Sequence, residues 1–178
     1  MTVLDDNEVI AACQRGDREA FRALFETYQD RVYSIALRYA GDPARALDIA
    51  QDVFVKLLNN IGDFKGLSGF ETWLYRMVVN RCLDDRRRVR RWSAIVEGLF
   101  AGTSEPSALD ELVRSEAQER VQKTVAMLPA EQRIVVVLRY TEGLSYTEIA
   151  KAVGCSEGTV ASRLNRAHRF LERRLKVR

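Results

Sequence analysis

Near the C-terminus, three residues have the spacing expected where two helices meet at a tight turn. Ala150 is small where two helix backbones would approach, Gly154 follows four residues later, and Val160 follows after a further six. Glycine tolerates the positive φ of such a turn, and an apolar residue in the second helix closes the angle between the helices. The spacing predicts a helix-turn-helix, whose second helix would place side chains in the major groove of DNA.

Helix-capping residues support two helices around this turn. Ser145 and Glu148 have the spacing of a capping box and would open the first helix, which Gly154 would end. Ser156 can cap the second helix, which we expect to run to Arg169. The side chains that this helix would turn inward are Val160, Leu164, Ala167 and Leu171.

The other faces of the predicted recognition helix carry polar and basic side chains. The candidates for contact with duplex DNA are Ser156, Thr159, Ser162, Arg163, Asn165, Arg166 and Arg169. Of these, we expect Ser162, Asn165 and Arg166 to read base edges, because polar groups near the start of such a helix enter the groove. The alternative is that some of them only solvate the helix. Charges that we interpret as general phosphate or surface groups follow at Arg173, Arg174, Lys176 and Arg178.

Charge is distributed in blocks along the chain. Residues 76–92 carry 7 Lys and Arg against 2 Asp and Glu, and residues 133–178 carry 10 against 4. Between these basic blocks, residues 97–119 carry 1 against 6, and residues 1–63 carry 7 against 11. Basic blocks of this size suit a polyphosphate partner, because each neutralised phosphate releases counterions. The distribution favours nucleic acid as the partner.

Composition excludes several classes of protein. With 178 residues, 47% of them hydrophobic, the chain is expected to fold, and no apolar run is long enough for a membrane span. The polar start of the chain is unlike a signal peptide, so we expect a cytoplasmic protein. The 3 cysteines have no paired spacing, which argues against disulfides and a zinc site. The single His168 has no grouped nucleophile or base, so we expect no enzymatic activity, no metal and no cofactor.

Helical periodicity runs through nearly the whole chain and predicts an all-α fold. Asp17 would cap a helix that ends at Gly41, and residues 42 and 43, Asp-Pro, would start the next. A capping box at Ser68 and Glu71 would open a third helix that continues through the arginine-rich stretch. The apolar run at 134–138 is interpreted as a buried helix, although its β-branched residues have the propensity of a strand.

The helix that would start at residues 42 and 43, the second of these helices, has one polar face and one apolar face. Its outward positions include Asp48, Gln51, Asp52 and Lys56. Its buried face is predicted to hold Leu47, Ala50, Phe54, Leu57, Leu58 and Ile61.

Loss of periodicity and a Gly, Ser and Pro-rich composition mark residues 93–108 as a flexible linker. It would separate two small helical domains, residues 1–92 and residues 109–178. In the second domain we expect a first helical stripe of Leu109, Leu112, Val113, Val121, Val125 and Leu128.

Three stretches, taken together and in this order, resemble the extracytoplasmic-function sigma factors, small two-domain members of the sigma-70 family of bacterial transcription initiation factors. They are residues 48–57 (DIAQDVFVKL), residues 70–80 (FETWLYRMVVN), and residues 144–150 with 158–167 (LSYTEIA and GTVASRLNRA). The resemblance implies that the chain binds core RNA polymerase and promoter DNA. It also implies an anti-sigma factor as a partner and a monomer when free.

The resemblance gives the first domain two roles. Its second helix would dock on the polymerase clamp through Asp48, Gln51, Asp52, Val55 and Lys56. The melted −10 element would be held by the loop of residues 61–69, through Phe64 and Lys65, and by the DNA-facing helix that follows. That helix would contribute Asn80, Arg81 and Asp84, together with Arg87, Arg88 and Arg91 of the arginine cluster at residues 86–91. Single-stranded DNA needs such a positive groove with pockets for unstacked bases. Trp73 is interpreted as a core residue; the alternative is a wedge that separates the DNA strands.

The second domain would hold the −35 element as duplex, and the acidic linker would mimic nucleic acid in the RNA exit region of polymerase. Ala161, where many relatives carry a basic residue, and Asn165 leave the −35 sequence open. The alternative function is a helix-turn-helix transcriptional regulator that does not join polymerase, with the first domain sensing a ligand or dimerising. The unpaired arginine run argues against a sensor domain.

Overall fold

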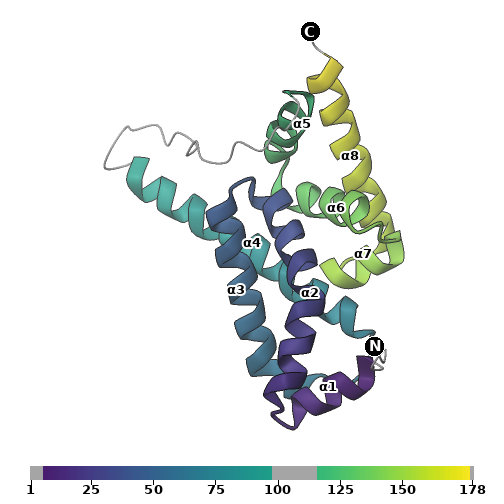
Figure 1. Cartoon of the computed structure of the whole chain (residues 1–178). Coiled ribbons are helices and arrows are strands. Elements are labelled where there is room, and N and C mark those ends of the chain that lie inside the picture. The colour runs from purple at the N-terminus through teal and green to yellow at the C-terminus, as the bar shows by residue number, and fades with distance from the viewer. Residues whose placement is uncertain (1–5, 98–115, 177–178) are drawn as a thin grey trace.

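The structure is a computed structural model that describes residues 6–97 and 116–176, without the side chains of residues 6, 86, 88–97 and 116–118. Within these ranges every regular element is helical, which confirms the all-α prediction (Figure 1). The elements are α1 (Asp6–Gln14), α2 (Arg18–Ala40), α3 (Pro43–Asn60), the 3-10 helix η1 (Ile61–Asp63), α4 (Phe70–Glu97), α5 (Glu116–Ala126), α6 (Ala130–Thr141), α7 (Tyr146–Val153) and α8 (Glu157–Lys176).

The boundary between α2 and α3 is set by capping residues. Asp17 opens α2 by accepting hydrogen bonds from the first-turn N–H groups of Glu19 and Ala20, at 2.9 and 3.1 Å. Gly41 ends α2 with φ +73°, a left-handed conformation that side chains with a Cβ rarely adopt. Asp42 then caps α3 by accepting from the N–H of Arg45 at 2.9 Å, and Pro43 occupies the first turn. These predicted helix ends are confirmed.

Helices α2, α3 and α4 enclose the core of the first domain. Its fully buried side chains include Ile35, Ala36, Ala46, Ile49, Leu57, Val78, Val79 and Cys82. The predicted burial of Leu47 and Leu58 is wrong, because these side chains are 51% and 54% exposed. Both lie at the edge of the apolar stripe. Successive residues of a helix are rotated by about 100°, so these two side chains point past the face of α3 that packs against α2 and α4.

The start of α4 differs from the prediction. The helix begins at Phe70, and the carbonyl of Gly69 accepts the N–H of Trp73 at 3.2 Å, so the capping position is Gly69 rather than Ser68. At its other end α4 continues to Glu97, which makes residues 93–97 helical where a linker was expected. Residues 98–108 of the predicted linker lie outside the described residues.

The second domain is built around α6. Residues 134–138 are buried in this helix, which confirms the helical interpretation of the β-branched run. A helix buries all of these side chains because α6 contacts α7 and α8 on one side and α2 and α4 on the other. On α5, Val125 and Leu128 beyond its end are buried, whereas Val121 is 45% exposed. The predicted stripe positions Leu109, Leu112 and Val113 lie outside the described residues.

The two domains pack against each other. Helix α6 contacts α2 and α4, α7 contacts α4, and α5 contacts α2, whereas α3 contacts α2, α4 and η1. Figure 1 shows α3 on the side of α2 that faces away from α7 and α8. One face of the first domain is therefore covered by the second, and no other described helix covers the outer face of α3.

Candidate nucleic-acid interface

The turn between α7 and α8 has the geometry predicted for a helix-turn-helix. The hydroxyl of Ser145 accepts from the N–H of Glu148 at 3.2 Å, and the carboxylate of Glu148 accepts from the N–H of Ser145 at 2.8 Å, which completes a capping box. The hydrogen bonds from Ser145 lower the pKa of Glu148, because they favour its charged form. Gly154 ends α7 with φ +74°, and its N–H donates to the carbonyl of Ala150 at 2.9 Å.

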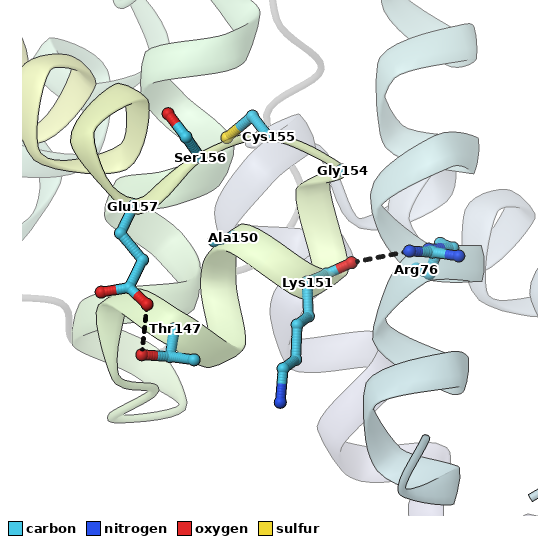
Figure 2. Close-up of a pocket in the computed structure, with 8 residues that line it drawn as sticks. All are labelled: Arg76, Thr147, Ala150, Lys151, Gly154, Cys155, Ser156 and Glu157. Carbon is cyan, nitrogen blue, oxygen red and sulfur yellow. Dashed lines mark hydrogen bonds between the residues drawn. The ribbon is translucent and has the colours of Figure 1, made fainter. Parts of the chain in front are cut away.

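A hydrogen-bonded cap opens α8, and one further contact fixes α8 against α7. The Oγ of Ser156, directly before α8, accepts from the N–H of Thr159 at 3.2 Å, and the two hydroxyls are 2.9 Å apart. The Oγ of Thr147 donates to Glu157 at 2.8 Å, which joins the first turns of both helices (Figure 2). Behind them, Val160 and Ala167 are fully buried. The crossing angle of the two helices is therefore held by packing and by side-chain hydrogen bonds.

The structure separates the seven predicted duplex contacts into two groups. Thr159 and Arg163 are half-buried. The Arg163 guanidinium pairs with Glu131 of α6 and lies 3.8 Å from the sulfur of Cys155, so it is directed into the domain. The exposed members are Ser156, Ser162, Asn165, Arg166 and Arg169.

Arginines continue along α8 and form a basic hollow with the edge of α5 and α6. This hollow of about 580 Å³ is lined by Met127, Pro129, Gln132, Arg166, Arg169, Phe170, Arg173 and Arg174. Arg174 lies with its guanidinium 5.6 Å from the centre of the Phe170 ring, a cation–π contact. Arg166 and Arg169 therefore connect the exposed Ser162 and Asn165 to a positive surface suited to phosphates.

The outer face of α3 carries a row of exposed side chains. They are Asp48, Gln51, Asp52, Val55 and Lys56, flanked by the exposed apolar Leu47 and Leu58. Val55 is 59% exposed, so the face combines charge with three accessible aliphatic side chains. Sequence reasoning missed Leu47 and Leu58, since periodicity alone does not distinguish the edge of a buried stripe from its centre.

One member of the predicted −10 group has a different environment from that expected. The Nε of Arg81 donates to Asp52 of α3 at 2.6 Å, and its Nη1 lies 3.7 Å from Asp85. Asp85 is nearly buried and also pairs with Arg45. Arg81 thus joins α4 to α3 through an ionic network. Its guanidinium is therefore already paired with two carboxylates in the free chain.

The other −10 candidates lie on the loop and the outer side of α4. Lys65 and Asn80 are exposed, and Asp84 pairs with Arg87 at 3.2 Å on the surface. Phe64 is half-buried with its ring centre 5.2 Å from that of Trp73, which is itself packed against the core. The side chains of Arg88 and Arg91 lie outside the described residues.

The loop before α4 is held from α1. The side-chain amide of Gln14 donates to the carbonyls of Ile61 and Phe64, at 3.0 and 2.8 Å. Gly66 supplies a positive φ of +69° and Leu67 is 92% exposed. The loop therefore has a fixed base at Phe64 and presents its tip to solvent.

Comparison with known proteins identifies both halves of the chain. Residues 24–92 match the family described as Sigma-70 region 2, and residues 118–171 match the family described as Sigma-70, region 4. The chain belongs to the extracytoplasmic-function sigma factors of the sigma-70 family. These matches account for the two helical domains and for the helix-turn-helix in the second.

Named relatives match along nearly the whole of both chains. The chain is 32% identical to the RNA polymerase sigma-H factor of Pseudomonas aeruginosa, over 98% of this chain and 96% of the relative. It is 34% identical to the ECF RNA polymerase sigma-E factor of Escherichia coli, over 97% of this chain and 95% of the relative. These relatives are sigma factors, which regulate transcription and are not enzymes.

Solved sigma factor structures share the fold. The sigma factor RpoE of Bartonella quintana, in complex with the anti-sigma factor NepR, superposes with a TM-score of 0.69 at 26% identity, over 88% of this chain and 97% of that one. CnrH, in complex with the cytosolic domain of CnrY, superposes with a TM-score of 0.68 at 26% identity, over 94% and 95% of the two chains.

Among the described residues of this sigma factor, no group of three or more His, Cys, Asp or Glu side chains is placed to hold a metal ion. Among the described helices, none has the length and apolar character needed to cross a membrane.

Proposed function

We propose that this sigma factor directs promoter-specific initiation in the cytoplasm by dividing its contacts between the two domains. The second domain, with α8 as its recognition helix, binds the −35 element as duplex. The loop before α4 and the outer side of α4 hold the melted −10 strand, and the outer face of α3 docks on core RNA polymerase. An anti-sigma factor is a further partner, by analogy with the NepR and CnrY complexes of the two structural relatives.

The observation that carries this proposal is a row of exposed side chains on α8, in a helix-turn-helix whose geometry is held by capping residues and side-chain hydrogen bonds. Ser162, Asn165 and Arg166 are all exposed, and Asn165 and Arg166 lie three and four residues after Ser162, the spacing of one helix face. A recognition helix places such side chains against base edges. Arg163 is not included among the base-reading residues, because its guanidinium is paired with Glu131.

A matched pair of arginine substitutions tests the role of α8. Arg166→Ala is expected to cost about 1–3 kcal/mol in binding a preferred duplex and to relax sequence preference. Arg173→Ala, on the same helix, is expected to weaken binding to all duplexes alike and to lower the slope of affinity against salt by about one. Neither change should alter binding to core polymerase. Equal loss of polymerase and DNA binding by Arg166→Ala would refute the division of contacts.

The α3 face is tested by placing a charge among its aliphatic groups. Val55→Asp should weaken binding to core polymerase, because the interface would then have to bury a carboxylate where the parent chain buries an aliphatic side chain. Val121→Asp provides the control, since Val121 is also a partly exposed valine on a helix surface. If Val55→Asp binds polymerase as tightly as the control, docking through α3 is wrong.

Run-off transcription distinguishes a sigma factor from the alternative regulator. Core polymerase with this chain should initiate at promoters that share one −35 and one −10 sequence. Mapping of transcription start sites on overexpression should recover the same two sequences. A regulator that does not join polymerase would give no initiation without another sigma factor.

A further inference from the structure

Helix α1 (Asp6–Gln14) has no part in the proposed function. It ends before residue 24, where the match to Sigma-70 region 2 begins, and it carries none of the proposed DNA or polymerase contacts. Its Ile10 and Cys13 are buried, and the helix contacts α2 and η1. Figure 1 shows α1 across the end of the first domain at which α3 stops. Helix α1 therefore lies at the base of the loop of residues 61–69, here called the −10 loop.

The end of α1 is tied to the start of α2. The chain turns at Gly16, which has φ +87° and donates its N–H to the carbonyl of Cys13 at 3.0 Å. A residue with a Cβ would rarely adopt this φ. The N–H of Asp17 donates to the carbonyl of Ala12 at 3.1 Å, while the Asp17 carboxylate caps α2. Gln14, the last residue of α1, is therefore carried by a backbone that is fixed on both sides.

Gln14 holds both ends of the turn that closes η1. Its side-chain amide donates to the carbonyl of Ile61 at 3.0 Å and to the carbonyl of Phe64 at 2.8 Å. The Ile61 carbonyl also accepts the N–H of Phe64 at 3.2 Å. The last carbonyls of a helix need partners from outside it, and an amide NH2 group has the two donors that two carbonyls require. Because Ile61 is only 4% exposed, Gln14 connects the −10 loop to the core.

The bond to Phe64 also fixes the first peptide of the loop tip. A peptide unit is planar and trans, so the Phe64 carbonyl and the Lys65 N–H point in opposite directions. The carbonyl points to Gln14, so the N–H points away from it, and this N–H donates no hydrogen bond within the described residues. The Phe64 ring is held as well, with its centre 5.7 Å from that of Phe70 and 5.2 Å from that of Trp73. The Lys65 N–H is thus a free donor with a fixed direction.

We infer that Gln14 is a positioning residue for reading the −10 element, and that α1 acts on base selection without touching DNA. A loop that receives an unstacked base discriminates best when its donors are held in place before the base arrives. Gln14 supplies this constraint from outside the loop. The inference requires that the −10 loop binds melted DNA, and so it rests on the proposed function.

The test separates hydrogen bonding by Gln14 from its packing. Gln14→Met keeps a side chain of similar length without donors, whereas Gln14→Lys keeps donors for the two carbonyls. Core polymerase with each variant transcribes a library of duplex promoters whose −35 and −10 blocks are randomised, and the transcribed promoters are sequenced. Gln14→Met should lower the preference for the best over the second-best base in the −10 block by about fivefold, the contribution of about one hydrogen bond. Preference in the −35 block should not change.

Gln14→Lys should restore the −10 preference. Its added positive charge strengthens binding to every sequence, and a ratio between two bases cancels that gain. The matched control is Gln29→Met, which changes a half-buried glutamine of α2 and should leave both preferences as in the parent.

Amide hydrogen exchange reports the loop in the absence of DNA. Exchange in the peptide of residues 61–69 should be about fivefold faster in Gln14→Met and close to the parent rate in Gln14→Lys and Gln29→Met. Unchanged exchange in Gln14→Met would overturn the positioning role, because the loop would then be held without Gln14.

Lys65→Ala, within the loop, distinguishes failure of the inference from failure of the proposed function. If Lys65→Ala lowers the −10 preference and Gln14→Met does not, the positioning role is overturned and the proposed function stands. If neither variant changes the −10 preference, the loop does not read the −10 element and both are overturned. An equal loss of −10 and −35 preference in Gln14→Met, with a lower Tm, would make Gln14 a residue of general stability and overturn the inference alone.

Discussion

Substitution of Arg81 tests whether its main partners are the carboxylates of α3 and α4. In Arg81→Met the aliphatic stem is kept and the charge removed. The pair with Asp52, whose side chain is 57% exposed, is worth at most about 1 kcal/mol. Asp85 has a side chain only 11% exposed and keeps Arg45, so loss of its second cation costs about 1–2 kcal/mol, less than the complete loss of a buried pair. The expected destabilisation is about 2 kcal/mol, or a fall of about 4–8 °C in Tm.

Urea unfolding followed by circular dichroism measures this change, with Arg87→Met as the control. Arg87 lies on the same helix and pairs with Asp84, but both side chains are highly exposed, at 72% and 64%, so the control should lose under about 0.5 kcal/mol. Binding to single-stranded DNA should show the opposite order. Arg87→Met should lose more affinity than Arg81→Met, because the accessible Arg87 can reach phosphates more easily. Equal unfolding free energies for the two variants would refute the structural role of Arg81.

Three further measurements address the second domain and the thiols. Ser145→Ala should destabilise by about 1 kcal/mol at neutral pH. Because the pKa of Glu148 is lowered from an ordinary value of 4.5, the capping contribution is present above that pH and lost as the pH falls, so the difference between variant and parent should shrink in acid urea titrations. Leu164→Ala, at 2% exposure, should cost about 2–5 kcal/mol in the same titrations and abolish duplex binding in gel-shift assays. Burial raises the pKa of the Cys82 thiol to about 12, so alkylation of the native chain at pH 8, read by mass spectrometry, should modify half-buried Cys155 first; faster labelling of Cys82 would contradict its burial.

Local features of the site could be predicted from the sequence because short-range chemistry determines them. The caps at Asp17, Asp42 and Ser145 and the left-handed turn at Gly154 each depend on residues within about one helical turn. For the same reason the start of the recognition helix and its buried face were predictable, whereas α8 continues to Lys176, beyond the predicted end at Arg169. The Ser68 cap was wrong because Gly69, with no side-chain cap, precedes a helix whose position is fixed by packing of Phe70 and Leu74 in the core.

Only the tertiary structure decided which polar side chains remain available to partners. Arg81 and Arg163 have the residue type and position of DNA contacts, but each forms an ion pair with a carboxylate from a different helix, Asp52 and Glu131. Pairing between residues about 30 positions apart depends on how helices cross, which periodicity does not specify. The contacts of Glu142 between the two domains could not be predicted for the same reason. Glu142 lies just beyond the end of a helix, and nothing in the sequence around it indicates that Arg31 and Tyr75 hold its carboxylate.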